Sequence, residues 1–127
     1  MEAANQSFSD YSKIAKEVFT FLTENFNYKF VETIDEKFLV RHTYRNRWRR
    51  RKIVIENQSF PGDYGFSFWI YNLLTKEKYL LHNTWLEEDK MSSSLNLIKN
   101  KIISNTQFVN LIKGKNWKVD KIHLPEF

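Results

Sequence analysis

The stretch FLVRHTYRNRWRRRKIVIE, residues 38–56, joins two strand-like runs through a strongly cationic centre. Phe38 to Tyr44 and Trp48 to Glu56 are rich in β-branched and aromatic residues, a composition typical of strands. Arg45 to Arg47 lies between them and contains Asn46, which tolerates turn geometry. The stretch therefore predicts a β-hairpin in the middle of the chain.

The register of this hairpin is predicted from its apolar residues. Pairing Val40 with Ile53 also brings Phe38 opposite Ile55, so both pairs can lie on the core face of the sheet. The same register closes the hairpin at residues 46–47. Because side chains alternate along a strand, it also decides which cations face outward.

Cations are denser in this hairpin than anywhere else in the sequence. In the predicted register Arg41 faces Lys52, and like charges directly opposite each other destabilise a sheet by up to about 1 kcal/mol. An anionic partner would relieve this repulsion, and Arg binds carboxylate and phosphate groups through paired hydrogen bonds. We therefore predict a partner-binding surface formed by Arg41, Tyr44, Arg45, Arg47, Trp48, Arg49, Arg50, Arg51 and Lys52. The alternative is a solvated hairpin whose cations only protect strand edges.

The segments before and after the hairpin predict further elements. Apolar residues recur every three or four positions from about Asp10 to Asn25, which indicates a helix. Further strands are expected at Tyr28 to Ile34, Phe66 to Leu74 and Tyr79 to His82. The segment Asn57 to Gly65 contains Pro61-Gly62 and predicts a long loop.

The last third of the sequence is expected to be mainly helical. One of Ser92 to Ser94 can cap a first helix, and Thr106 can cap a second, although a single bent helix remains open. Gly114 is the expected C-terminal stop of the helical region. Trp117 to Leu124 is a candidate edge strand, and Trp85 is expected to pack between the sheet and a helix.

This order of elements predicts an α+β fold. We expect an N-terminal helix, a four- to five-stranded antiparallel meander sheet, and C-terminal helices packed on one side. Residues 1–127 are long enough for one hydrophobic core and are expected to form a single domain.

Catalytic and metal-binding motifs are weak in this sequence. There is no Cys, which excludes thiolate chemistry, and His42, His82 and His123 are far apart. Asp63 and Glu88-Asp89-Lys90 match the letters of a metal-dependent nuclease motif, but they stand in loop-like and acidic contexts. We therefore expect no catalytic residue, no metal site and no cofactor.

The remaining composition bears on location and on partners. Residues 1–10 lack the basic and apolar regions of a signal peptide, and no apolar stretch approaches the length of a membrane span. A cytoplasmic protein without membrane contact is expected. The net charge of +5 favours anionic partners without naming one.

The layout of helix, meander and helices, together with the short length and absent cysteines, resembles small bacterial immunity proteins that neutralise a toxin. The resemblance implies a non-enzymatic, inhibitor-like binding protein. Immunity proteins that block nucleases are commonly acidic, whereas this chain is basic, so its partner would present an acidic surface.

Two further interpretations stay open beside the immunity type. The same hairpin could bind nucleic acid, with phosphates on its cations and bases on Trp48 or Tyr44. A secretion chaperone also fits the size, although such chaperones are usually acidic dimers. The sequence does not decide the oligomeric state.

Overall fold

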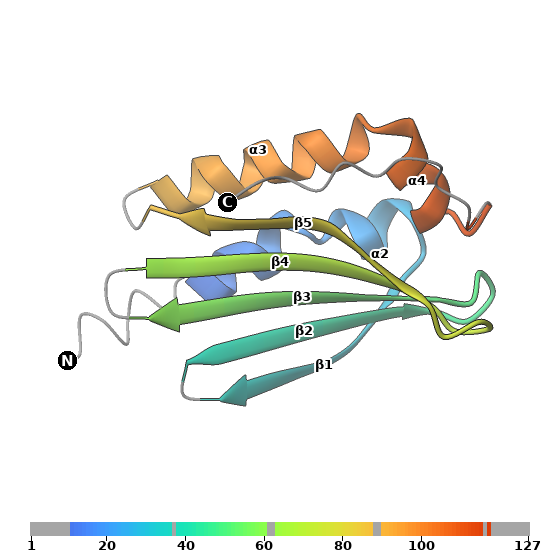
Figure 1. Cartoon of the computed structure of the whole chain (residues 1–127), viewed down its shortest axis with the longest axis horizontal. Helices are drawn as coiled ribbons and strands as arrows, with labels where there is room; N and C mark the ends of the chain where they lie inside the picture. Colours follow the sequence, from blue (N-terminus) through green and yellow to red (C-terminus); the bar gives the residue numbers. More distant parts are fainter. Residues whose placement is uncertain (1–10, 37, 61–62, 88–89, 116, 118–127) are drawn as a thin grey trace.

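The computed structural model describes residues 11–36, 38–60, 63–87, 90–115 and 117. The chain has the predicted α+β fold, with N-terminal helical segments, a five-stranded antiparallel sheet and two C-terminal helices (Figure 1). The strands are β1 (Lys29–Glu36), β2 (Leu39–Asn46), β3 (Arg51–Phe60), β4 (Asp63–Asn72) and β5 (Lys78–Leu86). Residues 11–18 are helical, and they are followed by α2 (Phe21–Asn25), α3 (Met91–Ile103) and α4 (Thr106–Ile112).

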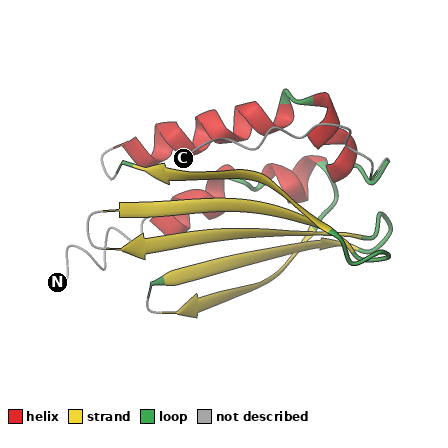
Figure 2. Ribbon diagram, viewed as in Figure 1, coloured by secondary structure: helices red, strands yellow, loops and turns green. Residues whose placement is uncertain are grey.

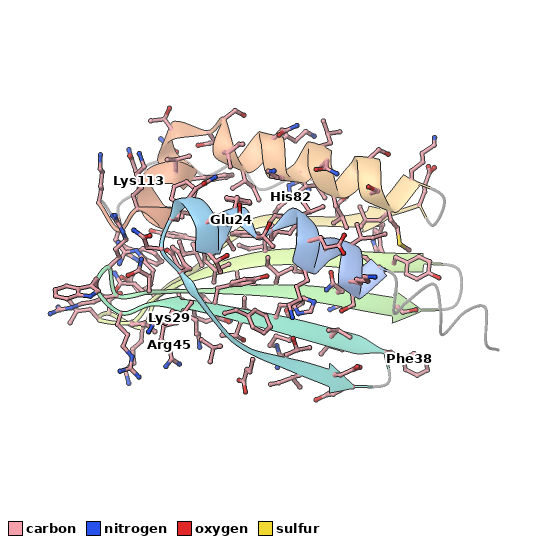
Figure 3. The ribbon with its side chains drawn as sticks, turned by 180° about the vertical axis from the view of Figure 1, so that it is seen from behind. Glu24, Lys29, Phe38, Arg45, His82 and Lys113 are labelled. Carbon is pink, nitrogen blue, oxygen red and sulfur yellow. The ribbon has the colours of Figure 1, made fainter. Side chains whose placement is uncertain are left out.

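The sheet is a simple meander in which each strand pairs with its neighbour in sequence. The helices lie on one side of it, as Figure 2 shows, and the view from behind in Figure 3 looks at this helix-covered side. We call the opposite side the outer face. In the described part of the chain, one face of the sheet therefore packs against helices, and the other does not. Alternate side chains along each strand must suit these two environments.

The core forms between the inner face of the sheet and the helices. Phe66, Phe68 and Ile70 of β4 alternate inward and are fully buried, as their spacing predicts. The ring of Phe19 from the N-terminal segment stacks on Phe66 at 5.5 Å between centroids. Leu95 of α3 is fully buried in the same cluster. Each such side chain contributes about 2 kcal/mol by leaving water, so this cluster fixes the position of the sheet.

The predicted hairpin register is wrong by four residues. Tyr44, and not Val40, lies opposite Ile53, and Val40 lies opposite Asn57. Within β2 and β3 the predicted faces survive, because a shift by an even number of residues keeps each side chain on the same side. Phe38, which was expected in the core opposite Ile55, is instead 52% exposed. Arg41 and Lys52, which the predicted register places opposite each other, are therefore apart. Arg41 faces Glu56, and Lys52 faces Arg45.

The expected long loop from Asn57 to Gly65 is also largely wrong. β3 continues to Phe60, and β4 begins at Asp63, so only residues 61–62 separate the two strands. Gly65 belongs to the ladder, where it pairs with Trp85 of β5. An added Cβ there would come within 3.1 Å of the Gln58 side chain and 3.4 Å of the Trp85 ring. Gly65 therefore leaves room for the indole on the outer face. Trp85 itself is 52% exposed, so its predicted burial under a helix is wrong.

The helix ends differ from the predicted caps by a few residues. The N-terminal helix is interrupted at residues 19–20, where the Thr20 amide bonds to Glu17 three residues back. α3 begins after Lys90, so the three serines lie in its first turn. α4 is a separate helix, capped by the Asn105 side chain, which accepts a hydrogen bond from the Phe108 amide at 3.1 Å.

Gly114 ends the helical region as predicted. Its φ of 73° is the left-handed conformation that follows many helices, and its amide bonds back to the carbonyl oxygen of Leu111. An added Cβ would lie 2.7 Å from the Cβ of Arg49. Only glycine therefore fits where α4 meets the hairpin. Of the candidate strand from Trp117 to Leu124, residues 118–124 lie outside the described residues.

Candidate partner-binding site

The turn between β2 and β3 comprises residues 47–50, four cationic or aromatic side chains that all point to the surface. Asn46 holds the turn from its base. Its Oδ1 accepts from the Arg49 amide at 3.1 Å, and its Nδ2 donates to the carbonyl oxygen of Phe26 at 3.1 Å. Arg50 has a φ of 54°, and its amide bonds to the carbonyl oxygen of Arg47. The turn is therefore ordered by its own hydrogen bonds, and Trp48 at its apex is 98% exposed.

Two of the predicted binding residues form hydrogen bonds with the end of α4. Arg51 is only 5% exposed, and its Nε donates to the carbonyl oxygen of Leu111 at 3.0 Å. Arg49 donates to the carbonyl oxygen of Lys113, and the Tyr28 hydroxyl donates to that of Ile112 at 2.6 Å. The last carbonyls of a helix have no partner within it, so these three donors complete its C-terminus.

Two more predicted residues are occupied or buried. Arg41 binds Glu56 through Nε at 3.1 Å and through Nη2 at 2.8 Å, so its charge is neutralised within the sheet. Tyr44 lies in the core, where burial raises the pKa of its hydroxyl to about 12. Neither side chain is available at the surface of the turn.

The other cations form a row across the outer face of the sheet. Lys29 of β1 faces Arg45 of β2, and Arg45 faces Lys52 of β3. The row continues through Tyr71 of β4 to Lys78 of β5. The ammonium of Lys52 lies 4.6 Å from the centre of the Tyr71 ring. Figure 3 labels Lys29 and Arg45 together at the turn end of the sheet.

Two hollows flank the turn, and Trp48 lines both of them. The first has a volume of about 470 Å³ and is lined by Asn27, Lys29, Phe30, Val31, Arg45, Asn46, Arg47 and Trp48. The second has a volume of about 600 Å³ and is lined by Trp48, Arg49, Arg50, Arg51, Asn72, Leu74, Lys113, Gly114, Lys115 and Trp117. Every charged side chain among these described lining residues is cationic.

We call this surface the basic tip. It consists of Lys29, Arg45, Arg47, Trp48, Arg49, Arg50, Lys52, Lys113 and Lys115. Within the described ranges, the ion pairs of the chain are Arg41 with Glu56 and Lys90 with Glu87, and neither touches the basic tip. Among the described residues that line the two hollows, the charges are therefore all positive, which favours an anionic partner.

The structure adds three residues that the sequence argument missed. Lys29 could have been found, because it starts the strand that pairs with β2. Lys113 and Lys115 flank the predicted helix stop at Gly114, but only the contact between α4 and the hairpin brings them to the tip.

His42 and His82 are buried parts of the fold. His42 is buried, with Nε2 at 3.1 Å from the Ser12 hydroxyl and Nδ1 at 3.1 Å from the Thr33 hydroxyl. Burial lowers the pKa of His42, and the cation of Lys16 lowers it further, so the ring favours its neutral form. His123, Glu88 and Asp89 lie outside the described residues.

Metal-ligand geometry and membrane-spanning helices can be judged for the described part of the chain. There, His, Asp and Glu side chains do not gather in groups of three or more that could hold a metal ion. In the same residues, no helix combines the length and the apolar character needed to cross a membrane. The cytoplasmic location stays a prediction.

The chain was also compared with known proteins. It matches no protein-family model, and neither the curated proteins nor the solved structures gave a match.

Proposed function

We propose that this chain is a non-enzymatic binding protein of the immunity or inhibitor type, which docks on an acidic protein surface through the basic tip. The observation that carries the proposal is the pair of hollows on either side of Trp48. Their described linings contain seven cationic positions, Lys29, Arg45, Arg47, Arg49, Arg50, Lys113 and Lys115, besides the buried Arg51. A surface of one charge attracts a partner of the opposite charge and speeds their encounter.

Trp48 supplies the apolar anchor of this proposed interface. A fully exposed indole contributes nothing to the core, and its turn is held in place by the Asn46 side chain. Trp and Arg are the residues that most often dominate binding energies at protein interfaces. An ordered turn also reduces the entropy lost when a partner binds.

The repulsion within the basic row supports a binding role as well. Arg45 has a lysine directly opposite it on each side, Lys29 and Lys52, and the fold gains nothing evident from that arrangement. Such neighbours destabilise a sheet by up to about 1 kcal/mol per pair. Carboxylates of a partner would convert this repulsion into attraction on binding.

A second candidate function is the binding of single-stranded nucleic acid on the outer face. It is favoured by one observation, the alternation of cations with aromatic rings along the row. Lys78 lies 4.7 Å from the centre of the Trp69 ring, next to Tyr71 and Lys52. Basic grooves with aromatic rings bind single strands by phosphate contacts and base stacking. This version does not use Tyr44, because Tyr44 is buried.

One capture experiment separates the two candidates. The full chain is immobilised and exposed to an extract of its source cells, with and without nuclease treatment, beside a Trp48→Ala variant. We expect one acidic protein, bound in a one-to-one complex, insensitive to nuclease and at least tenfold depleted on the variant. Capture of nucleic acid alone, with affinity that falls steeply as salt rises, would replace the proposal with the second candidate.

A further inference from the structure

The first hollow beside the turn has a chemically mixed lining. It contains the cations Lys29, Arg45 and Arg47 and the apolar side chains Phe30, Val31 and Trp48. With a volume of about 470 Å³, it is in the range of pockets that accept small ligands or single side chains. Its occupant should therefore combine a negative charge with an apolar group.

Arg45 lines this hollow. Among the described arginines of the hairpin, it is the one with a buried nitrogen that lacks a hydrogen-bond partner. Its Nε is buried and finds no hydrogen-bond acceptor among the described residues. In contrast, the corresponding nitrogens of Arg41 and Arg51 each have an oxygen partner, from Glu56 and Leu111. A buried donor without an acceptor is costly, because it has lost its bonds to water.

The surroundings of Arg45 increase that cost. Lys29 and Lys52 lie directly opposite it on the two neighbouring strands. Asn46, the nearest polar neighbour in sequence, already uses both ends of its amide within the fold. An oxygen anion placed against the guanidinium of Arg45 would offset its positive charge and screen the two lysines at the same time.

We propose that this hollow is the subsite for a carboxylate of the acidic partner, carried beside an apolar or aromatic group. The carboxylate accepts hydrogen bonds from the planar guanidinium of Arg45, whose fork fits two oxygens, with Lys29 and Arg47 adding charge. The neighbouring group lies against Trp48, Phe30 and Val31. This inference rests on the proposed function, because it specifies which part of the partner the basic tip receives.

A carboxylate fits this mixed lining better than a phosphate backbone does. An amino acid brings a carboxylate and an apolar group within a few atoms of each other, which suits a hollow lined by both cations and apolar side chains. A nucleic-acid strand keeps its phosphates on a polar backbone, and it would follow the cationic row across the sheet more naturally than it would enter this hollow.

The test uses a matched pair of small probes on the full chain. N-acetyl-tryptophan carries a carboxylate beside an indole, and N-acetyl-tryptophanamide has the same body without the charge. Chemical shifts of the Arg45 Nε–H and of the Trp48 indole are followed by NMR during each titration. We expect saturable shifts at both positions with the acid, and at least tenfold weaker binding of the amide.

Two variants make the assignment specific. Arg45→Gln should weaken binding of the acid at least tenfold. Lys13→Gln, which removes the same charge from an exposed position away from the basic tip, should change it less than twofold. Equal binding of the two probes, or unchanged binding to Arg45→Gln, would overturn the carboxylate subsite. So would saturable binding of adenosine monophosphate without binding of the acid, because it would make the hollow a phosphate site.

The two proposals can fail separately. If the captured partner loses affinity for Trp48→Ala but binds Arg45→Gln unchanged, the subsite is wrong while the proposed function stands. If the acid binds as expected and no acidic protein is captured, the subsite is supported and the proposed function is wrong.

Discussion

The Nε of Arg51 donates a hydrogen bond of 3.0 Å to the carbonyl oxygen of Leu111, and so joins the third strand to the end of the last helix. The guanidinium also lies 4.9 Å from the centre of the Trp117 ring. One arginine of the cationic run thus holds the fold together, while its neighbours in sequence stand at the surface. Within β3, Arg51 and Lys52 lie on opposite faces because side chains alternate along a strand.

Arg51→Met should destabilise the protein by about 2 kcal/mol. The substitution keeps much of the apolar stem but leaves the Leu111 carbonyl without a donor in a buried place. Urea unfolding followed by circular dichroism measures the loss. Arg50→Met is the matched control, because Arg50 is exposed, and it should change stability by less than about 0.5 kcal/mol. Equal effects of the two variants would contradict the structural role of Arg51.

Gly114→Ala should also be destabilising, by about 1–2 kcal/mol. Alanine is strained at a φ of 73°, and its Cβ would meet the Cβ of Arg49 at 2.7 Å. Gly65→Ala is the comparison, because its Cβ would first meet the flexible end of Gln58 at 3.1 Å. Thermal unfolding of both variants should show the larger loss at Gly114. A larger loss of stability in Gly65→Ala would contradict the close contact between Gly114 and Arg49.

Stability should fall as the pH is lowered from about 7 to 5. Burial lowers the pKa values of His42 and His82 below their ordinary value, so the folded state binds fewer protons than the unfolded state, whose histidines titrate near 6.5. Unfolding therefore takes up protons, and the free energy of unfolding decreases once the pH drops below about 6.5. Urea unfolding at pH 7.5, 6.5 and 5.5 measures this slope. His42→Gln should reduce the slope, whatever its effect on absolute stability, and an unchanged slope would refute the assignment to His42.

Arg45→Thr should stabilise the protein at low salt, by up to about 1 kcal/mol. Removing this charge ends two cross-strand repulsions, with Lys29 and with Lys52. Salt screens exposed charges over about 10 Å at 0.1 M, so the gain should shrink as the salt concentration rises. Arg41→Thr should have the opposite sign, because it breaks the ion pair with Glu56. Urea unfolding of both variants at two salt concentrations checks the signs, and a loss of stability in Arg45→Thr would show that the row is not repulsive.

The sequence predicted the fold class and the inward residues of the strands, but it did not predict the hairpin register. Apolar alternation is satisfied equally by any even shift, so Ile53 fits opposite Val40 or opposite Tyr44. The turn decides between these registers. Arg50 adopts a positive φ, and the Asn46 side chain bonds to the Arg49 amide, which makes a four-residue turn. Neither feature is visible in a hydrophobic pattern.

The candidate site was predicted in part for a similar reason. Exposed cations of the turn follow from composition, and Trp48 is at the surface as a binding anchor requires. The hydrogen bonds of Arg51 and Arg49 to the end of α4 depend on contacts between segments about 60 residues apart, which local patterns do not contain. The same contacts bring Lys113 and Lys115 to the tip.

The affinity of a charge-reversed tip for the captured partner tests the central claim most directly. The double variant Arg47→Glu with Arg50→Glu inverts two exposed charges, one beside each hollow. Its control is Lys13→Glu with Lys101→Glu, which inverts two exposed charges elsewhere. Titration calorimetry measures the affinity of both variants for the captured partner. The account predicts at least a hundredfold loss for the first pair and less than a threefold change for the second, with both proteins folded. Equal affinities of the two double variants would place the binding surface away from the basic tip.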